Sequence, residues 1–425
     1  MFETIRKAWA VAELRQRMIF TLLMVGVFRL GNAIPVPFMN KEMVAQVMGG
    51  SGQAGILNLL NLLSGNSLSQ MSIFALSIYP FITASIIIQL LTVAIPRLQE
   101  IARDGEMGKK KIGKYTKIGA VILGFIEGYA IVNGLFSQAI VEQSMFSGFV
   151  ILLSMVAGSM FLIWLGEMIT EKGVGNGISI IIFLGIISGL PGQIGNIWTQ
   201  FQTGLIQWWQ ILLLLIIVIF VLWVVVMVNE GERKIPVQYA KRVVGRKMYG
   251  GQSTHIPVKV NMAGVMPVIF ASSILQLPNT IALLFGADMP GWVQSIFTVE
   301  TTSGLIIYAI INLLLIILFA YFYTAIQFNP VEYAKNLQQY GGFIPGIRPG
   351  KSTGEYLQRI SNRITFIGAL SLALVSSGPM LIAKLLGVEI VFGGTAIIIV
   401  VGVILDTLKQ MDSMLTMRHY KGFLK

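Results

Sequence analysis

The sequence predicts an all-α polytopic membrane protein with ten transmembrane helices, and three observations support this prediction. Hydrophobic residues make up 55% of the 425 residues and charged residues only 12%, about half the charged share of an ordinary soluble domain. Apolar runs long enough to cross a bilayer recur along the whole chain. Lys and Arg lie almost entirely in alternate connections between these runs, as the positive-inside rule requires.

Each apolar run predicts one transmembrane helix. The ten predicted spans are Met18–Val36, Met71–Ala94, Ile118–Phe136, Phe146–Ile169, Asn176–Gly192, Trp209–Val228, Ile256–Leu284, Leu305–Phe328, Ile364–Leu386 and Val391–Leu408. Five spans precede a Gly- and Pro-containing connection and five follow it. Two halves with an odd number of spans must be inverted relative to each other, and a pathway commonly forms between such halves. We therefore expect a central pore.

This pattern divides the chain into four parts. We expect an N-terminal half at 1–190, an external hinge at 191–207, a C-terminal half at 208–411 and a cytoplasmic tail at 412–425. Of the 31 Lys and Arg residues, when those at span ends are counted with the neighbouring connection or tail, only Arg29, Lys41 and Lys384 lie outside the two tails and the even-numbered connections. This asymmetry places both termini in the cytoplasm.

A short apolar segment before the second span is too short to cross the membrane. Gly55–Leu63 has nine residues and as a helix would measure about 14 Å, under half of a hydrocarbon core of about 30 Å. Ser64–Ser67 follows as a helix-breaking turn. The short helix either dips into an internal cavity or its mouth, or lies flat on the outer interface. The spacing leaves both readings open.

Two long cytoplasmic connections, 229–255 and 329–362, are rich in Lys and Arg. The alternation of Ile235, Val237 and Tyr239 predicts a protruding hairpin in the first of them. Such loops could bind ribosomal RNA phosphates, anionic lipid or an acidic partner protein. Alternatively, their charge only sets the orientation of the chain in the membrane.

Patterns typical of enzymes are weak in this sequence. The chain has no Cys, and His255 and His419 lie far apart without a carboxylate cluster, so we predict no metal site, no cofactor and no enzymatic activity. Gly346–Ser352 has the wrong spacing for a phosphate-binding loop. Glu127 lies centrally in its span, but a proton-coupled carrier would normally show more such groups. A small-solute transporter remains an alternative, because it shares inverted halves and a broken helix.

Several stretches together resemble the SecY family, the channel-forming subunits of bacterial Sec protein translocases. The matching stretches are residues 29–37, 74–91, 164–182, 252–264, 343–350 and 392–395. The resemblance implies a gated protein-conducting channel in the cytoplasmic membrane. Unfolded secretory polypeptides would cross through it, and membrane segments would leave sideways into lipid. The pore would be hourglass-shaped and closed from outside by a plug helix.

The resemblance also assigns residues to parts of this channel. The plug would comprise Gly55, Ile56, Leu57, Asn58, Leu59, Leu60, Asn61, Leu62 and Leu63. A ring of apolar side chains at the constriction would comprise Ile78, Ile82, Ile178, Ile182, Ile269 and Ile399. An apolar ring excludes water and ions, yet flexible aliphatic side chains can fit around an extended polypeptide.

Further residues are assigned to the lateral exit and to partner binding in the same way. The resemblance places the lateral gate between spans two and three and spans seven and eight, with Thr83, Glu127 and Asn261 as polar contacts. Docking of the ATPase SecA or of a ribosome would use Arg348, Lys241, Arg242, Arg246 and Lys247. The implied partners are SecE- and SecG-like small membrane subunits, SecA, the ribosome, signal peptides and nascent polypeptides, and membrane lipid.

Overall fold

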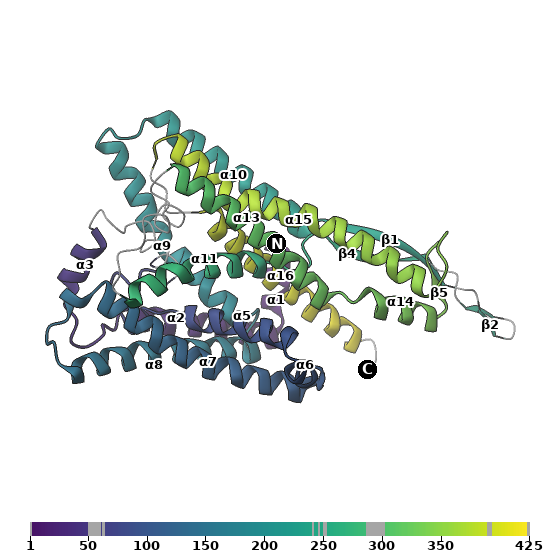
Figure 1. Ribbon diagram of the computed structural model, residues 1–425. Coiled ribbons are helices and arrows are strands. Elements are labelled where there is room, and N and C mark those ends of the chain that lie inside the picture. Colours follow the sequence, from purple (N-terminus) through teal and green to yellow (C-terminus); the bar gives the residue numbers. More distant parts are fainter. Residues whose placement is uncertain are drawn as a thin grey trace.

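The computed structural model of the chain describes residues 2–49, 61, 64–239, 242–244, 247–249, 253–285, 302–388 and 393–422. Long helices run side by side through most of the molecule, and a pair of strands extends beyond one end of them (Figure 1). The first half contains α1 (Phe2–Ala10), α2 (Ala12–Asn32), α3 (Lys41–Gly49), α5 (Tyr79–Ala94), α6 (Pro96–Arg103), α7 (Gly105–Gly134), the 3-10 helix η1 (Ser137–Ala139), α8 (Met145–Lys172) and α9 (Gly177–Gln202).

The second half continues with helices and a small sheet. Its elements are α10 (Trp208–Glu230), β1 (Glu232–Tyr239), β2 (Arg242–Val244), β3 (Lys247–Tyr249), β4 (Ser253–Lys259), α11 (Met266–Phe285), α13 (Thr302–Gln327), α14 (Pro330–Gln339), β5 (Gly342–Phe343), α15 (Lys351–Leu385) and α16 (Gly394–Gly422). The strand order β4-β1-β5 is antiparallel, with Ile235 opposite Ile256. The predicted hairpin is therefore confirmed.

The predicted all-α membrane fold is confirmed, with one helix for each predicted span. Within the described residues, seven helices are long and apolar enough to cross a membrane by themselves, namely α7, α8, α9, α10, α13, α15 and α16. Helices α5 and α6 pass that test together but are bent by 103° at their junction. Helix α2 carries three arginines, and the apolar part of α11, Met266–Pro278, is shorter.

The predicted start of the second span at Met71 is wrong. Helix α5 begins at Tyr79, with a proline in its first turn, and the backbone before it is irregular. Met71 and Ser77 have φ angles of 45° and 51°, a left-handed region that a helix cannot accommodate. Residues 64–78 therefore form a coiled segment rather than the start of the span.

Two other predicted span ends are also wrong. The seventh span was expected to begin at Ile256, but residues 253–259 form β4, and α11 begins only at Met266. A strand forms here because residues 253–259 pair with β1. Val258 of this strand is also buried in an apolar cluster that includes residues of α15. The fifth span was expected to end at Gly192, but α9 continues to Gln202. Helical structure therefore extends through much of the region expected to be a hinge.

The coiled segment is held inside the first half by backbone and side-chain hydrogen bonds. Val36 N donates to Met71 O at 2.8 Å, and Ile73 N donates to the carbonyl of Ile34 at 3.0 Å. Ser67 Oγ donates to Asn32 Oδ1 at 2.8 Å. These bonds tie the segment to the end of α2, so its polar groups do not face lipid.

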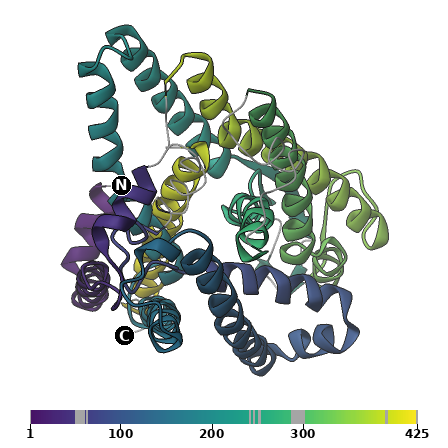
Figure 2. The same cartoon turned by 60° about the vertical axis from the view of Figure 1, so that its left-hand side comes forward.

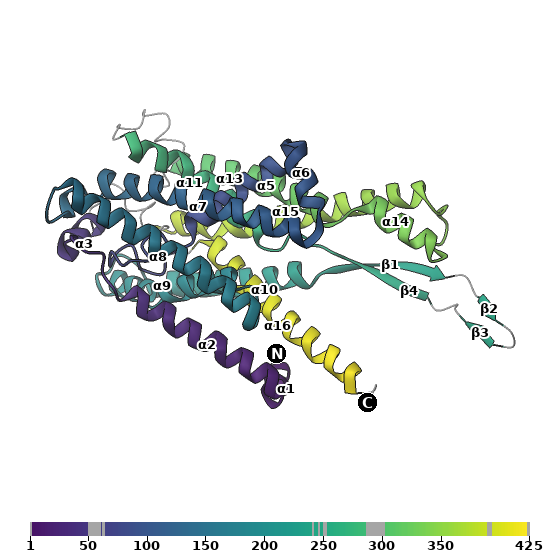
Figure 3. The ribbon, with the colours of Figure 1, turned by 90° about the horizontal axis from the view of Figure 1, so that it is seen from below.

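The basic connections gather at one end of the molecule. Helices α6 and α14, the β1–β4 hairpin and the end of α16 lie together at the right of Figure 1, whereas α3 lies at the opposite end. Helix α1 lies near α16 on this side (Figure 3), where Ala8 and Met411 share a buried cluster. This arrangement agrees with a single basic face, as expected from the sequence.

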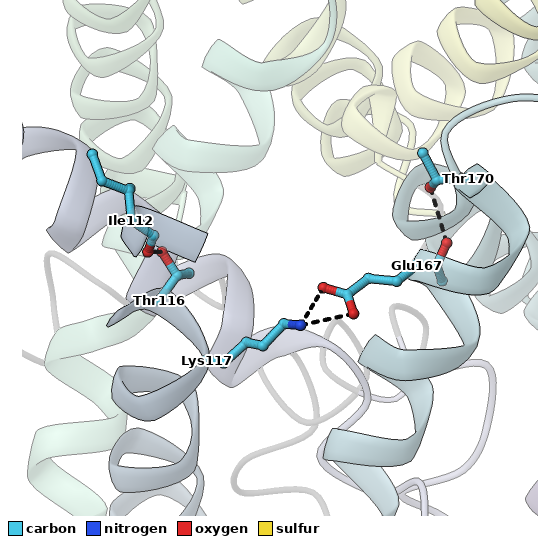
Figure 4. A network of polar contacts seen from close by, with 6 residues as sticks. Ile112, Thr116, Lys117, Glu167 and Thr170 are labelled. Atoms are coloured by element: carbon cyan, nitrogen blue, oxygen red, sulfur yellow. Dashed lines mark hydrogen bonds and ion pairs between the residues drawn. The ribbon is translucent and has the colours of Figure 1, made fainter. Parts of the chain in front are cut away.

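An ion pair joins two neighbouring spans near the same end. Lys117 Nζ of α7 lies 2.7 Å from Glu167 Oε1 and 2.8 Å from Glu167 Oε2 of α8 (Figure 4). One turn further along α8, Thr170 Oγ1 accepts a hydrogen bond from Gly177 N, the first residue of α9, at 2.8 Å. These contacts hold α7 against α8 and α8 against the start of α9.

Replacing Gly158 with alanine is expected to destabilise the protein. A Cβ atom at Gly158 of α8 would lie 1.9 Å from Ile73 O in the coiled segment, so α8 would have to move away. We expect a loss of about 1–3 kcal/mol in the free energy of unfolding, measured from thermal unfolding in detergent. Gly148→Ala on the same helix is the matched control, because nothing lies within 4 Å of its Cβ position. Equal effects of the two substitutions would contradict this account.

Candidate functional site

A cavity lies between the two halves and is bordered by the coiled segment. Its volume is about 50 Å³. From the first half it is lined by Ser64, Leu68, Ala75, Leu76, Ser77, Ile78, Tyr79, Ile82, Glu127, Ile131 and Ile182, and from the second by Ile269, Ser272, Ser273 and Ile399. The wall is mostly aliphatic, with a few hydroxyl groups and one carboxyl group.

Five of the six isoleucines expected at a pore constriction line this cavity. Four come from four different helices, namely Ile82 from α5, Ile182 from α9, Ile269 from α11 and Ile399 from α16, and Ile78 is the residue immediately before α5. Four of them also belong to the largest buried apolar cluster, which joins the two halves. Helices distant in the sequence thus direct the same type of side chain to one place.

The sixth isoleucine, Ile178, does not line the cavity. It lies one helical turn before Ile182 on α9 and is half-buried. A Cβ atom placed on Gly166 of α8 would lie 3.2 Å from Ile178 Cγ1, so this side chain packs against α8. The arrangement differs from the expected ring of six at this position.

Of the residues expected to form the plug, Gly55–Leu63, all except Asn61 lie outside the described residues. Asn61 is bound to the turn that follows it: its Nδ2 donates to Asn66 Oδ1 at 3.2 Å, and its Oδ1 accepts from Ser69 N at 3.0 Å. The described chain next to this segment, including Ser64, contributes to the cavity wall. The predicted turn at residues 64–67 is present, with positive φ angles at Gly65 and Asn66.

The carboxyl group in the cavity wall belongs to Glu127 of α7. Its side chain is 4% exposed, and neither carboxyl oxygen has a hydrogen-bond partner among the described residues. Thr83 of α5 lies beside it and is also buried, with its hydroxyl donating to Tyr79 O at 3.2 Å. A buried, unpartnered carboxyl group is unfavourable for stability, which makes it a candidate functional group.

Asn261, the third polar residue expected at a lateral gate, lies in a different environment. It precedes α11, and its Nδ2 donates to Asn229 Oδ1 at 2.7 Å and to Gly264 O at 3.0 Å. The bond to Asn229 links the base of α11 to the end of α10. Thr83 and Glu127 are thus brought together, whereas Asn261 is engaged within the second half.

The interface between the halves also contains polar residues that the sequence reasoning missed. Figure 2 shows α11 between the helices of the first half and the rest of the second half. Tyr79 OH of α5 donates to Ser273 O of α11 at 3.0 Å, and Tyr323 OH of α13 donates to Gln89 Oε1 of α5. Tyrosines are common in apolar spans, and no spacing pattern marks those whose hydroxyl reaches another helix.

The residues expected to bind partners all belong to the two basic connections, 229–255 and 329–362. Arg348 is exposed in the turn between β5 and α15, and its carbonyl accepts a hydrogen bond from Thr353 Oγ1 at 2.8 Å. Arg242 and Lys247 lie on β2 and β3, beyond the β1–β4 hairpin (Figure 1). Lys241 and Arg246 lie outside the described residues. In the part of the chain that the structure describes, no three His, Asp or Glu residues come together as metal ligands.

Comparisons with known proteins agree on one family. The family model described as SecY matches residues 72–408. The chain is 47% identical to the protein translocase subunit SecY of Halalkalibacterium halodurans and 44% identical to that of Bacillus subtilis, with the whole of each chain covered in both cases. A solved structure described as a protein-conducting channel is similar in fold, with a TM-score of 0.68, 19% identity and 93% and 91% of the two chains covered.

Replacing Glu127 with glutamine is expected to stabilise the protein. The amide keeps the shape of the side chain but removes a carboxyl group that has no partner in the described residues, which lowers the cost of burial by about 1–3 kcal/mol. The midpoint of thermal unfolding should therefore rise. Glu106→Gln, at an exposed position of the same helix, should leave the midpoint unchanged. A lower midpoint for Glu127→Gln would show that the carboxylate makes a favourable interaction.

Proposed function

The chain belongs to the SecY family, and we propose that the cavity between its halves is the path of a gated protein-conducting channel. The protein is a translocase subunit and not itself an enzyme. Unfolded secretory polypeptides pass through the cavity, and membrane segments leave sideways into the cytoplasmic membrane. A partner ATPase or a ribosome supplies the driving force. The observation that carries the proposal is the convergence of isoleucines from four elements on one cavity.

The ion seal of this channel is the ring formed by Ile78, Ile82, Ile178, Ile182, Ile269 and Ile399. Five of these line the cavity, and aliphatic side chains repel water and ions from a narrow passage. The same side chains have no directional bonds to break, so they can separate around a polypeptide and close again. Ile178, which lies one turn before Ile182 on α9 and outside the cavity wall, is included from the family resemblance.

The plug is the short helix Gly55–Leu63. Two features support this proposal: nine helical residues cannot span the bilayer, and the turn that follows borders the cavity through Ser64 and Leu68. Ser188 Oγ of α9 donates to Gly65 O at 3.2 Å, which anchors the turn. The plug therefore has a fixed attachment at its C-terminal end.

The lateral gate is the seam between α5 and α7 of the first half and α11 and α13 of the second. Thr83 and Glu127 are polar groups on the first-half side of this seam, and Asn261 supports the base of α11 through its bond to Asn229. Polar groups at this depth contact a passing segment before it reaches lipid, so they favour segments apolar enough to leave.

The partners are proposed from charge and from the family. Arg348 and the basic residues Lys241, Arg242, Arg246 and Lys247 bind SecA or the phosphates of a ribosome, and a related solved structure is described as Sec61 in a ribosome–channel complex. SecE- and SecG-like subunits, signal peptides, nascent chains and lipid contact the membrane part. Both termini lie in the cytoplasm, on the side of the basic connections.

Replacing the ring isoleucines that line the cavity with serine is expected to raise the ion conductance of the resting channel in planar bilayers. Hydroxyl groups allow water into a passage that aliphatic side chains keep dry. Polypeptide translocation should continue, because the smaller serine side chains do not narrow the passage. Matched controls are Ile87→Ser and Ile404→Ser, on the exposed sides of α5 and α16. A ring variant that stays as tight as these controls would contradict the proposed seal.

Arg348→Glu is expected to reduce partner-driven export by about tenfold, because reversing one interface charge weakens the attraction between the partners. Export into membrane vesicles by purified SecA is the measurement. The control is Lys335→Glu on α14, an exposed position with the same change in charge. Thermal unfolding should be unaffected by either substitution. Normal export by Arg348→Glu would remove this docking role.

A further inference from the structure

We propose that the hydroxyl groups of Tyr79 and Tyr323 form a double latch that holds the seam between the halves closed. The inference rests on the proposed function, because it assumes that this seam opens. Each tyrosine belongs to one half, and its hydroxyl donates a hydrogen bond to an acceptor on the other half. Both bonds must break before α5 can separate from α11 and α13.

The first bond lies beside the cavity. Tyr79 is the first residue of α5, and its hydroxyl donates to Ser273 O of α11 at 3.0 Å. Ser273 is 3% exposed and its own hydroxyl donates to Ile269 O at 2.9 Å. The acceptor is a backbone carbonyl, so it moves with α11 and cannot follow α5 by a side-chain rotation.

The second bond joins α13 to α5. The ring of Tyr323 packs edge-on against Phe270 of its own half, with centroids 5.2 Å apart, so only its hydroxyl crosses the seam to Gln89 Oε1. Gln89 is in turn held on α5, where its Nε2 donates to Ser85 Oγ at 3.3 Å. The donor and the acceptor of this bond are thus each held in place by a contact within their own half.

The separation of the two bonds explains why two are present. Tyr79 and Gln89 are ten residues apart on α5, which is about 15 Å along the helix axis. One bond alone would leave α5 free to pivot about it, whereas two bonds at this distance also oppose rotation. The apolar side chains between them pack closely but have no preferred direction, so they resist sliding less than the hydrogen bonds do.

Phenylalanine substitutions test the latch because they remove only the hydroxyl group. The chain contains no Cys, so spin labels can be placed through Ile87→Cys on α5 and Ile326→Cys on α13, both exposed. Pulsed electron paramagnetic resonance on the reconstituted full chain then gives the distance between α5 and α13. We expect Tyr79→Phe and Tyr323→Phe each to raise the ratio of open to closed molecules about threefold, and both together about tenfold.

Two further variants separate the latch from general loosening. Tyr321→Phe is the matched control, because Tyr321 lies on α13 but donates to Asn362 O of α15 within the same half, at 3.0 Å; it should leave the ratio unchanged. Gln89→Met removes the acceptor of Tyr323. It should give the same threefold rise, with no further rise when combined with Tyr323→Phe.

The latch is overturned if Tyr79→Phe and Tyr323→Phe leave the distance distribution unchanged, or if Tyr321→Phe shifts it equally. A further rise when Gln89→Met is combined with Tyr323→Phe also contradicts the second bond. These outcomes are independent of transport. Failure of the wild-type channel to translocate polypeptide would instead contradict the proposed function, while a shifted distance distribution would still support the latch.

Discussion

The structure depends on one constraint: backbone polar groups at membrane depth must find partners inside the protein, because lipid offers none. Residues 64–78 are neither helix nor strand, yet they lie between spans. They are tolerated because the chain just after α2 supplies hydrogen-bond partners such as Ile34 O, and because Gly158 lets α8 approach the backbone of Ile73 closely. The irregular segment therefore creates the cavity and also depends on the helices that enclose it.

Two kinds of contact join the halves, one apolar and one hydrogen-bonded. The cavity wall contributes aliphatic side chains that exclude water and can part without a large directional cost. The seam contributes hydroxyl groups whose bonds are specific in direction and number. A channel that must stay tight to ions and still open sideways needs both properties, and here different residues of α5 provide them: Ile82 faces the cavity, whereas Gln89 binds across the seam.

Much of this architecture could be predicted from the sequence, because apolar length and Lys and Arg asymmetry directly reflect the bilayer. The predicted starts of the second and seventh spans were wrong because tertiary contacts outweighed hydropathy there. Met71 is apolar but lies in a coiled segment, and Ile256 is apolar but pairs with a strand. The ring isoleucines required the family resemblance, since Ile is common on every face of these helices. Tyr79 and Tyr323 were missed because a hydroxyl that reaches a distant helix leaves no periodic signal.

The junction between the β1–β4 hairpin and the membrane helices has a mechanical consequence. Strand β1 starts two residues after Glu230, the last residue of α10, and Glu230 Oε1 lies 2.9 Å from Lys409 Nζ of α16. Ile399 lies ten residues before Lys409 on the same helix. A displacement of the hairpin would therefore be transmitted through α10 and the Glu230–Lys409 ion pair to α16, whose Ile399 lies in the cavity wall.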